Sequence, residues 1–249
     1  MSINYDLLAP DYQQYRIPDA RIAARINHHI PPGSKVLNVG AGQGSYEPAY
    51  CNVTAIEPSR EMISRRPPAS APAIEGCAEN LPFEDNSFDI ALAILTIHHW
   101  LDVQKGVREL ARVARSKVVI LTWNGNYGDF WLPDYIPQIV TADTGLFPTT
   151  DRLSEWLGGA ISEEIVSIPH DCTDGMMCAY WRRPEMYLNA TARLAISTFS
   201  KLGDTGAELD CLRSDIISGR WHQKYQALLG RQSLECGYTL ITHDRNQLE

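Results

Sequence analysis

The sequence predicts an α/β fold: a doubly wound, mostly parallel sheet with helices on both faces. A mostly apolar run, Lys35–Val39, ends abruptly in a glycine-rich turn, as a buried strand does before a ligand-binding loop. A second, uninterrupted apolar run, Ile90–Ile94, is typical of a central parallel strand that is buried on both faces. Helical patterns alternate with these strands along the chain. In such sheets, ligands bind at the carboxyl ends of the strands.

Composition narrows the class of protein. The chain has 249 residues, of which 44% are hydrophobic and 21% charged, which is enough for one large globular α/β domain or a core with a cap. Its formal net charge of -8 argues against nucleic acid or an anionic membrane as partner, because phosphates require a basic face. The longest apolar stretch, Ile90–Ile97, is too short to span a bilayer.

Cysteine usage and the first residues indicate the compartment. The six cysteines include no CxxC pair and no metal-ligand spacing, so we expect reduced thiols and no metal site. Residues 1–20 are polar and interrupted by Pro10 and Pro18, which does not fit a signal peptide. We therefore expect a cytoplasmic protein. The sequence indicates no oligomeric state.

A helical arm is expected before the first strand, in residues 1–34. Tyr15 and Arg16 could cap the carboxylate of a ligand, or could pack the arm onto the domain. Asp19 is expected to cap a helix whose isoleucines recur at helical spacing, Ile22 and Ile26 among them.

The glycine turn and the acid that follows it resemble a nucleoside site. Gly40, Gly42 and Gly44 leave bare backbone N–H groups where a ligand can approach. The next strand, Asn52–Ile56, ends on Glu57, whose carboxylate could accept hydrogen bonds from both ribose hydroxyls. The alternative is a structural charge at the start of the helix that follows.

Candidate catalytic and substrate-binding residues follow the next two strands. His98 and His99 come directly after the central strand, where one imidazole could act as a base; the alternative is a structural pair. Trp100, Trp123 and Asn124 are candidates for the walls of a substrate pocket.

From Val36 to Asn124 the sequence resembles the class I S-adenosylmethionine-dependent methyltransferases, and within them the small-molecule group that includes the ubiquinone and menaquinone C-methyltransferases. The matching blocks are Val36–Gly44, Ile56-Glu57-Pro58-Ser59-x-x-Met62, Gly76-x-Ala78-Glu79-x-Leu81-Pro82-Phe83, Ser87-Phe88-Asp89 and Ile97–Trp100. The resemblance implies a Rossmann-like sheet of seven strands, the last antiparallel. It also implies methyl transfer from S-adenosyl-L-methionine to a small-molecule acceptor, with S-adenosyl-L-homocysteine as product.

The resemblance also assigns residues to the cofactor. It places the turn residues against the methionine part, Glu57 on the ribose, and the remaining positions around the adenine or beneath the cofactor. These positions are Asn38, Gly40, Ala41, Gly42, Glu57, Pro58, Met62, Ala78, Glu79 and Leu95. Asn38 departs from the family, which usually has an acid there, and so does Cys77, where some relatives have an aspartate.

The second half of the chain is expected to select the substrate. An aromatic loop that contains Trp131 could cover the site. Residues 173–231 are expected to form a helical cap, inserted into a core of residues 35–172 and 232–249 before the final strand. Such an insert resembles the cap of trans-aconitate and malonyl carrier-protein methyltransferases, which makes Tyr180, Trp181 and Arg182 substrate candidates; the alternative is a helix face held to the core.

Other functions fit less well. The GxGxG spacing differs from the GxGxxG of nicotinamide dehydrogenases. A tRNA or other nucleic-acid methyltransferase is disfavoured by the acidic balance and by the lack of an Asn-Pro-Pro-Tyr-type block. A non-catalytic S-adenosylmethionine-binding module remains the alternative outside the enzymes, and it would be favoured if the aromatic lid filled the pocket.

Overall fold

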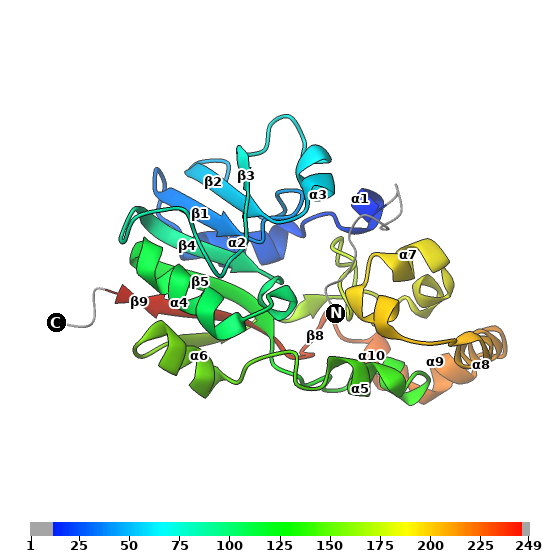
Figure 1. The fold of residues 1–249 in the computed structure, drawn as a ribbon. Coiled ribbons are helices and arrows are strands. Elements are labelled where there is room, and N and C mark those ends of the chain that lie inside the picture. The colour runs from blue at the N-terminus through cyan, green and yellow to red at the C-terminus, as the bar shows by residue number, and fades with distance from the viewer. Residues whose placement is uncertain (1–11, 246–249) are drawn as a thin grey trace.

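The computed structural model describes residues 12–245, so the start of the expected arm lies outside the described residues. A seven-stranded sheet runs through the molecule (Figure 1). Strand β9 is antiparallel to both of its neighbours and the other pairs are parallel, as the sequence predicts. In spatial order the strands are β3 (Ala73–Glu75), β2 (Asn52–Glu57), β1 (Lys35–Val39), β4 (Phe88–Ile94), β5 (Ala114–Trp123), β9 (Tyr238–Asp244) and β6 (Ser162–Ile165).

Helices cover both faces of this sheet because the side chains of the central strand alternate between them. Ala91 of β4 belongs to a buried cluster with α4 (Val103–Val113) and α6 (Thr150–Leu157). Leu92 belongs to a second cluster with α2 (Ala20–His28) on the opposite face.

Local signals set the ends of these helices. The Asp19 carboxylate accepts the N–H of Arg21 at 3.0 Å and caps α2, as expected. Helix α6 ends at Gly158, whose φ of +83° is the left-handed conformation that favours glycine. A short helix, α3 (Arg60–Ser64), follows β2.

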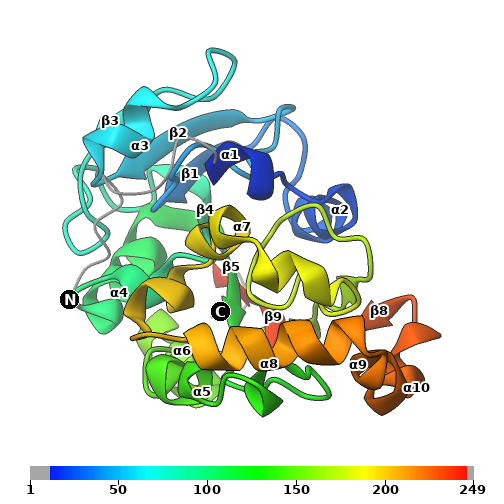
Figure 2. The ribbon, with the colours of Figure 1, turned by 90° about the vertical axis from the view of Figure 1, so that its right-hand side faces the viewer.

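A helical layer covers the carboxyl ends of the strands, with α8 running across it (Figure 2). Four 3₁₀ segments, at Ile97–His99, Leu132–Asp134, Pro184–Leu188 and Ser197–Lys201, complete the described helices. The α-helices outside the sheet layers are α1 (Tyr12–Tyr15), α5 (Gln138–Asp143), α7 (Ala190–Leu194), α8 (Gly206–Ile217), α9 (Arg220–Lys224) and α10 (Gln226–Leu229). A two-stranded sheet of β7 (Ile168–Pro169) and β8 (Ser233–Leu234), which the sequence does not predict, borders this layer.

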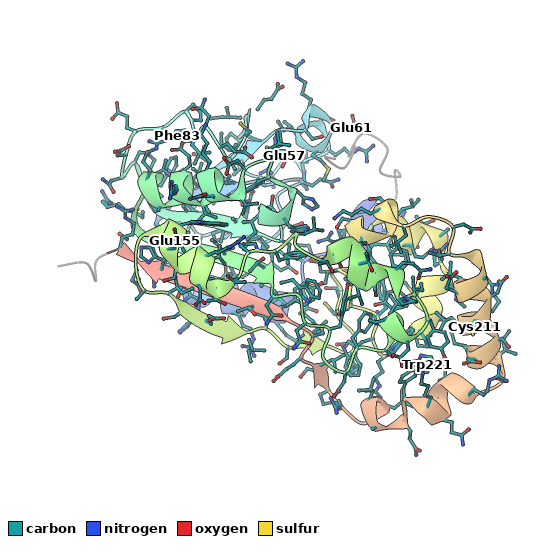
Figure 3. All side chains as sticks on the ribbon, turned by 60° about the horizontal axis from the view of Figure 1, so that its bottom comes forward. Glu57, Glu61, Phe83, Glu155, Cys211 and Trp221 are labelled. Carbon is teal, nitrogen blue, oxygen red and sulfur yellow. The ribbon has the colours of Figure 1, made fainter. Side chains whose placement is uncertain are left out.

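The cap and the sheet share one hydrophobic core. Trp131, Trp181 and Trp221 are at most 1% exposed and belong to the same buried cluster as strand residues such as Leu121. Figure 3 labels Trp221 in the cap. The cap is therefore continuous with the sheet's core. Within residues 12–245 there is no helix of the length and apolarity that crossing a membrane requires.

Candidate active site

The glycine turn after β1 is held against both neighbouring strands. The N–H groups of Gly40 and Ala41 donate to the carbonyl of Ile56 at 2.9 and 3.0 Å, which ties the turn to the end of β2. A Cβ on Gly40 would lie 2.0 Å from Oγ1 of Thr96, just beyond β4. With φ values of +69° and +51°, Gly40 and Gly42 also adopt a backbone that other residues rarely take. Sterics and backbone conformation both require glycine at position 40.

The carboxylate of Glu57 is buried beside this turn. The side chain is 6% exposed and accepts the N–H of Gly42 at 2.8 Å and that of Ser59 at 3.0 Å. Burial raises the pKa of Glu57, against the opposing effect of these two donors and of Arg66. Each carboxylate oxygen has a second lone pair, so the group can still accept hydrogen bonds from a ligand.

A cavity of about 860 Å³ opens at the carboxyl ends of the central strands. This volume lies within the range of small-ligand sites and leaves room for two ligands side by side. All but one of the residues expected to contact the cofactor line it. They are Arg16, Asn38, Gly40, Ala41, Gly42, Glu57, Pro58, Met62, Ala78, Glu79 and Leu95.

The floor of the cavity is strained where β4 ends. Leu95 has a φ of +52°, which is uncommon for a bulky residue. Its N–H donates to the carbonyl of Leu121 at 2.8 Å, so the bend is fixed to β5. This bend leads the chain directly into the segment that carries the two histidines.

His98 and His99 both line the cavity and lie against each other, with 3.8 Å between ring centroids. Burial lowers the pKa of His98 well below its usual range, and His99, Lys201 and Arg16 lower it further. Burial, Lys201 and Arg16 lower the pKa of His99 to about 3. Both imidazoles are therefore neutral at pH 7. Nδ1 of His98 is buried and has no hydrogen-bond partner among the described residues.

The opposite wall comes from the cap and from the segment at the end of α5, where sequence reasoning missed the contributing residues. Asp143 is 7% exposed and accepts hydrogen bonds from Tyr127 at 2.6 Å and from Thr198 at 3.0 Å. Burial raises the pKa of Asp143. Phe147 packs against His98, with ring centroids 4.6 Å apart, and Met177 adds further apolar surface. A lone aspartate, a lone phenylalanine and a methionine form no local motif, so the sequence carries no signal for them.

Three expected substrate contacts lie outside the cavity. Trp131 donates its indole N–H to the carbonyl of Trp181 at 2.6 Å, and Trp181 donates its own to Ile168 at 3.0 Å. Tyr180 is 3% exposed and packs on Tyr187. These rings pack in the shared core of cap and sheet, away from the residues that line the cavity.

Arg182 and Asn124 also lie away from the lining of the main cavity. Arg182 lies outside the described helices and donates to the carbonyl of Arg231 on the surface. Asn124 accepts the N–H of Asn126 and lines a second cavity of about 260 Å³. Trp100 and Trp123 do line the main cavity, and Trp123 is fixed by an N–H bond to the carbonyl of Cys236 at 2.7 Å.

Of the two arm residues that were expected near a ligand, only one lines the cavity. Tyr15 does not line the cavity; its hydroxyl accepts a hydrogen bond from Asn189, which packs the arm on the cap. Arg16 lines the rim, where its guanidinium pairs with the buried Asp174 and also donates to the carbonyl of Ala195. Arg16 therefore joins arm and cap at the edge of the cavity.

These features fit S-adenosylmethionine. The turn offers a close approach of bare backbone, because Gly40 and Gly42 have no side chains there. Glu57 offers a buried acceptor for hydroxyl groups at the end of β2. Met62 and Pro58 provide apolar surface beside Glu57.

Comparison with known proteins agrees with this geometry. Residues 37–122 match the family described as a methyltransferase domain. The crystal structure of a provisionally assigned methyltransferase from an antibiotic biosynthesis pathway of Anabaena variabilis superposes with a TM-score of 0.85 at 33% identity. The match covers 92% of this chain and 98% of that one, so it includes the cap as well as the sheet.

Two curated relatives are similar over part of the chain. The chain is 29% identical to 2-methyl-6-phytyl-1,4-hydroquinone methyltransferase 1 of rice, over 59% of this chain and 46% of the relative. It is 28% identical to the demethylmenaquinone methyltransferase of Paenarthrobacter aurescens, over 53% of this chain and 63% of the relative. The chain thus spans about half the length of the curated relatives it matches. From the match over nearly the whole length of the Anabaena protein, together with the domain match, we conclude that the chain belongs to the class I S-adenosylmethionine-dependent methyltransferases.

Proposed function

We propose that this protein transfers a methyl group from S-adenosylmethionine to a small molecule with an apolar, aromatic body and a hydroxyl group. One observation carries the proposal: a single cavity joins the glycine turn and Glu57 to an apolar wall of the cap. One ligand can therefore lie on the sheet while the other lies under the cap. Two adjacent ligands are what a transfer reaction requires.

On the cofactor side, each role is assigned from the chemistry of the lining. Glu57 would accept the ribose hydroxyls, because its carboxylate is buried and fixed by two backbone donors. Gly40 and Gly42 would let the methionine part lie against the backbone. Pro58 and Met62 would pack on the adenine, beside the segment of Ala78.

The chain's own contribution to the reaction is alignment and exclusion of water. S-adenosylmethionine, when bound, supplies a methyl group that its sulfonium makes electrophilic. Trp123, Phe147 and Met177 would hold the acceptor and keep water from the reacting atoms. Holding both reactants in line accounts for much of the rate enhancement that such an enzyme needs.

His98 would orient the acceptor. Because its imidazole is neutral and lines the cavity, a ring nitrogen that faces the cavity can accept a hydrogen bond from a hydroxyl. A pKa well below 7 makes it a weak base, so its first role would be to position the hydroxyl, and loss of a proton from the acceptor would follow as the acceptor atom forms its bond to the methyl group. Asp143 offers a second acceptor on the cap side.

The names of the curated relatives support an aromatic acceptor. One is named for a 1,4-hydroquinone and the other for demethylmenaquinone. The apolar lining that Trp123, Phe147 and Met177 provide suits a ring of that kind. We do not propose a nucleic acid as acceptor, because the net charge of -8 opposes phosphate binding.

The test is acceptor-dependent formation of S-adenosylhomocysteine. The purified protein is incubated with S-adenosylmethionine and a panel of methylated hydroquinones, naphthoquinols and simple phenols, together with small amines and carboxylic acids, and Glu57→Ala is the matched variant. We expect turnover with at least one ring acceptor and its loss in Glu57→Ala. Turnover confined to amines or carboxylic acids would contradict the proposed acceptor class. Tight binding of S-adenosylhomocysteine with no turnover on any acceptor would favour a non-catalytic binding module.

A further inference from the structure

We propose that Glu47 positions the amide of Asn38 so that the amide oxygen, not the nitrogen, faces the cofactor's amino group. The inference rests on the proposed function, because it assumes that the methionine part of S-adenosylmethionine lies along the glycine turn.

The orientation of the Asn38 amide follows from its hydrogen bond to Glu47. Asn38 is 2% exposed and lines the cavity, and its Nδ2 donates to Oε1 of Glu47 at 3.1 Å. An asparagine amide could be turned either way, but an ionised carboxylate can only accept hydrogen bonds. Glu47 therefore attracts the NH₂ group, and the amide oxygen points away from it.

Glu47 is itself held rigidly and does not line the cavity. Its carboxylate accepts hydrogen bonds from Arg66 at 2.7 and 2.8 Å and from the N–H of Ala71 at 3.3 Å. The side chains of Arg66 and Glu47 are 6% and 8% exposed. Arg66 also donates to the carbonyl of Gly42 at 3.0 Å, so the same pair anchors the glycine turn. Because Glu47 would reach the ligand only through Asn38, it is a positioning residue.

The ligand group that suits this arrangement is a cationic donor. A carbonyl oxygen accepts hydrogen bonds from an ammonium group, whereas an NH₂ group in the same place would repel it. Among the donors of S-adenosylmethionine, only the amino group of its methionine part is cationic. The arrangement thus provides a neutral acceptor at position 38. The carboxylate that orients it, Glu47, is paired with Arg66.

The test compares two probes by titration calorimetry. S-adenosylhomocysteine carries the amino group, and 5′-methylthioadenosine has the same adenine and ribose but lacks the amino acid part. In Glu47→Gln, the new amide can donate to the Asn38 oxygen and release the fixed orientation. We expect about a tenfold loss of affinity for S-adenosylhomocysteine, equivalent to about 1.4 kcal/mol, and less than a twofold change for 5′-methylthioadenosine.

A paired substitution supplies the control. In Asn38→Asp alone, two carboxylates would meet where a hydrogen bond now lies, so we expect weaker binding of S-adenosylhomocysteine. In Asn38→Asp combined with Glu47→Gln, the glutamine can donate to the new aspartate and binding should recover. If Glu47→Gln does not fold, Glu47→Asp keeps a carboxylate for Arg66 but shortens its reach to Asn38, and the same selective loss is expected.

Three outcomes would overturn the inference: equal losses for both probes, no loss for either, or a double variant no better than Asn38→Asp. The proposed function fails separately, if the wild-type protein binds neither probe.

Discussion

Glu57 and Gly42 are 15 residues apart in the sequence, yet the Glu57 carboxylate accepts the Gly42 N–H at 2.8 Å. The same carboxylate accepts the N–H of Ser59 at its other oxygen. One buried acid thus fixes both the glycine turn and the start of α3. The group proposed to bind the ribose also holds the loop proposed to bind the methionine part.

Replacing Glu57 should weaken cofactor binding through both roles. We expect Glu57→Ala to lower the affinity for S-adenosylhomocysteine at least tenfold, because the ribose loses its acceptor and the Gly42 N–H its partner. Glu61→Ala is the matched control: Glu61 lies on α3, pairs with Arg65 and does not line the cavity (Figure 3). Calorimetric titration of both variants checks this. Equal affinities of Glu57→Ala and Glu61→Ala for S-adenosylhomocysteine would contradict the role of Glu57 in binding the cofactor.

Replacing Gly40 by alanine should lower the free energy of unfolding more than the same replacement at another glycine of similar backbone conformation. Gly33 has a φ of +79° with nothing within 4 Å of an added Cβ, so Gly33→Ala bears only backbone strain, about 1 kcal/mol. Gly40→Ala adds a collision with Thr96, and we expect at least twice that loss in the free energy of unfolding. Urea denaturation measures both variants. Similar losses would mean that Thr96 moves aside freely.

The histidine pair should make stability depend on pH below 7. Because burial holds the pKa of His98 and His99 below the value in an unfolded chain, the unfolded state binds more protons as the pH falls. Stability is therefore complete above about pH 6.5 and declines as the pH falls, by roughly 2 kcal/mol for each histidine at pH 5.

His99→Gln tests this dependence. We expect its free energy of unfolding to fall less than that of the wild type between pH 7 and pH 5, in urea denaturation at each pH. His28→Gln, at an exposed position, controls for the loss of an imidazole. Parallel curves for wild type and His99→Gln would contradict the assignment.

Two tryptophans of the shared core should respond differently to the same substitution. The indole N–H of Trp131 donates to the carbonyl of Trp181, whereas that of Trp221 is buried and has no partner among the described residues. Trp131→Phe leaves a buried carbonyl unpaired, but Trp221→Phe removes an unpaired donor. We expect Trp131→Phe to be the more destabilising by about 1–3 kcal/mol in chemical denaturation. The reverse order would show that packing outweighs the hydrogen bond.

Local chemistry explains why the sheet and the cofactor side could be predicted from the sequence. Gly40 is required by its backbone conformation and by its contact with Thr96, and Glu57 is the last residue of strand β2. Features of this kind recur at fixed spacings within one βαβ unit, so they are visible without tertiary information.

The residues on the acceptor side could not be predicted, because they come together only through tertiary contacts. Asp143, at the end of α5, and Phe147 line the cavity only in the folded chain, and no spacing in the sequence marks them. The core position of Trp181 could not be predicted, because an aromatic side chain serves equally well in a core or in a pocket. Its indole N–H bonds to the carbonyl of Ile168, which is visible only in the folded chain.

The most direct test of the account is titration of the wild-type protein with S-adenosylhomocysteine at pH 7. The account predicts saturable binding with one site per chain and a rise in the melting temperature, because a ligand that binds only the native state stabilises it. An absence of both heat and thermal shift at millimolar ligand would contradict the assignment of this cavity to the cofactor.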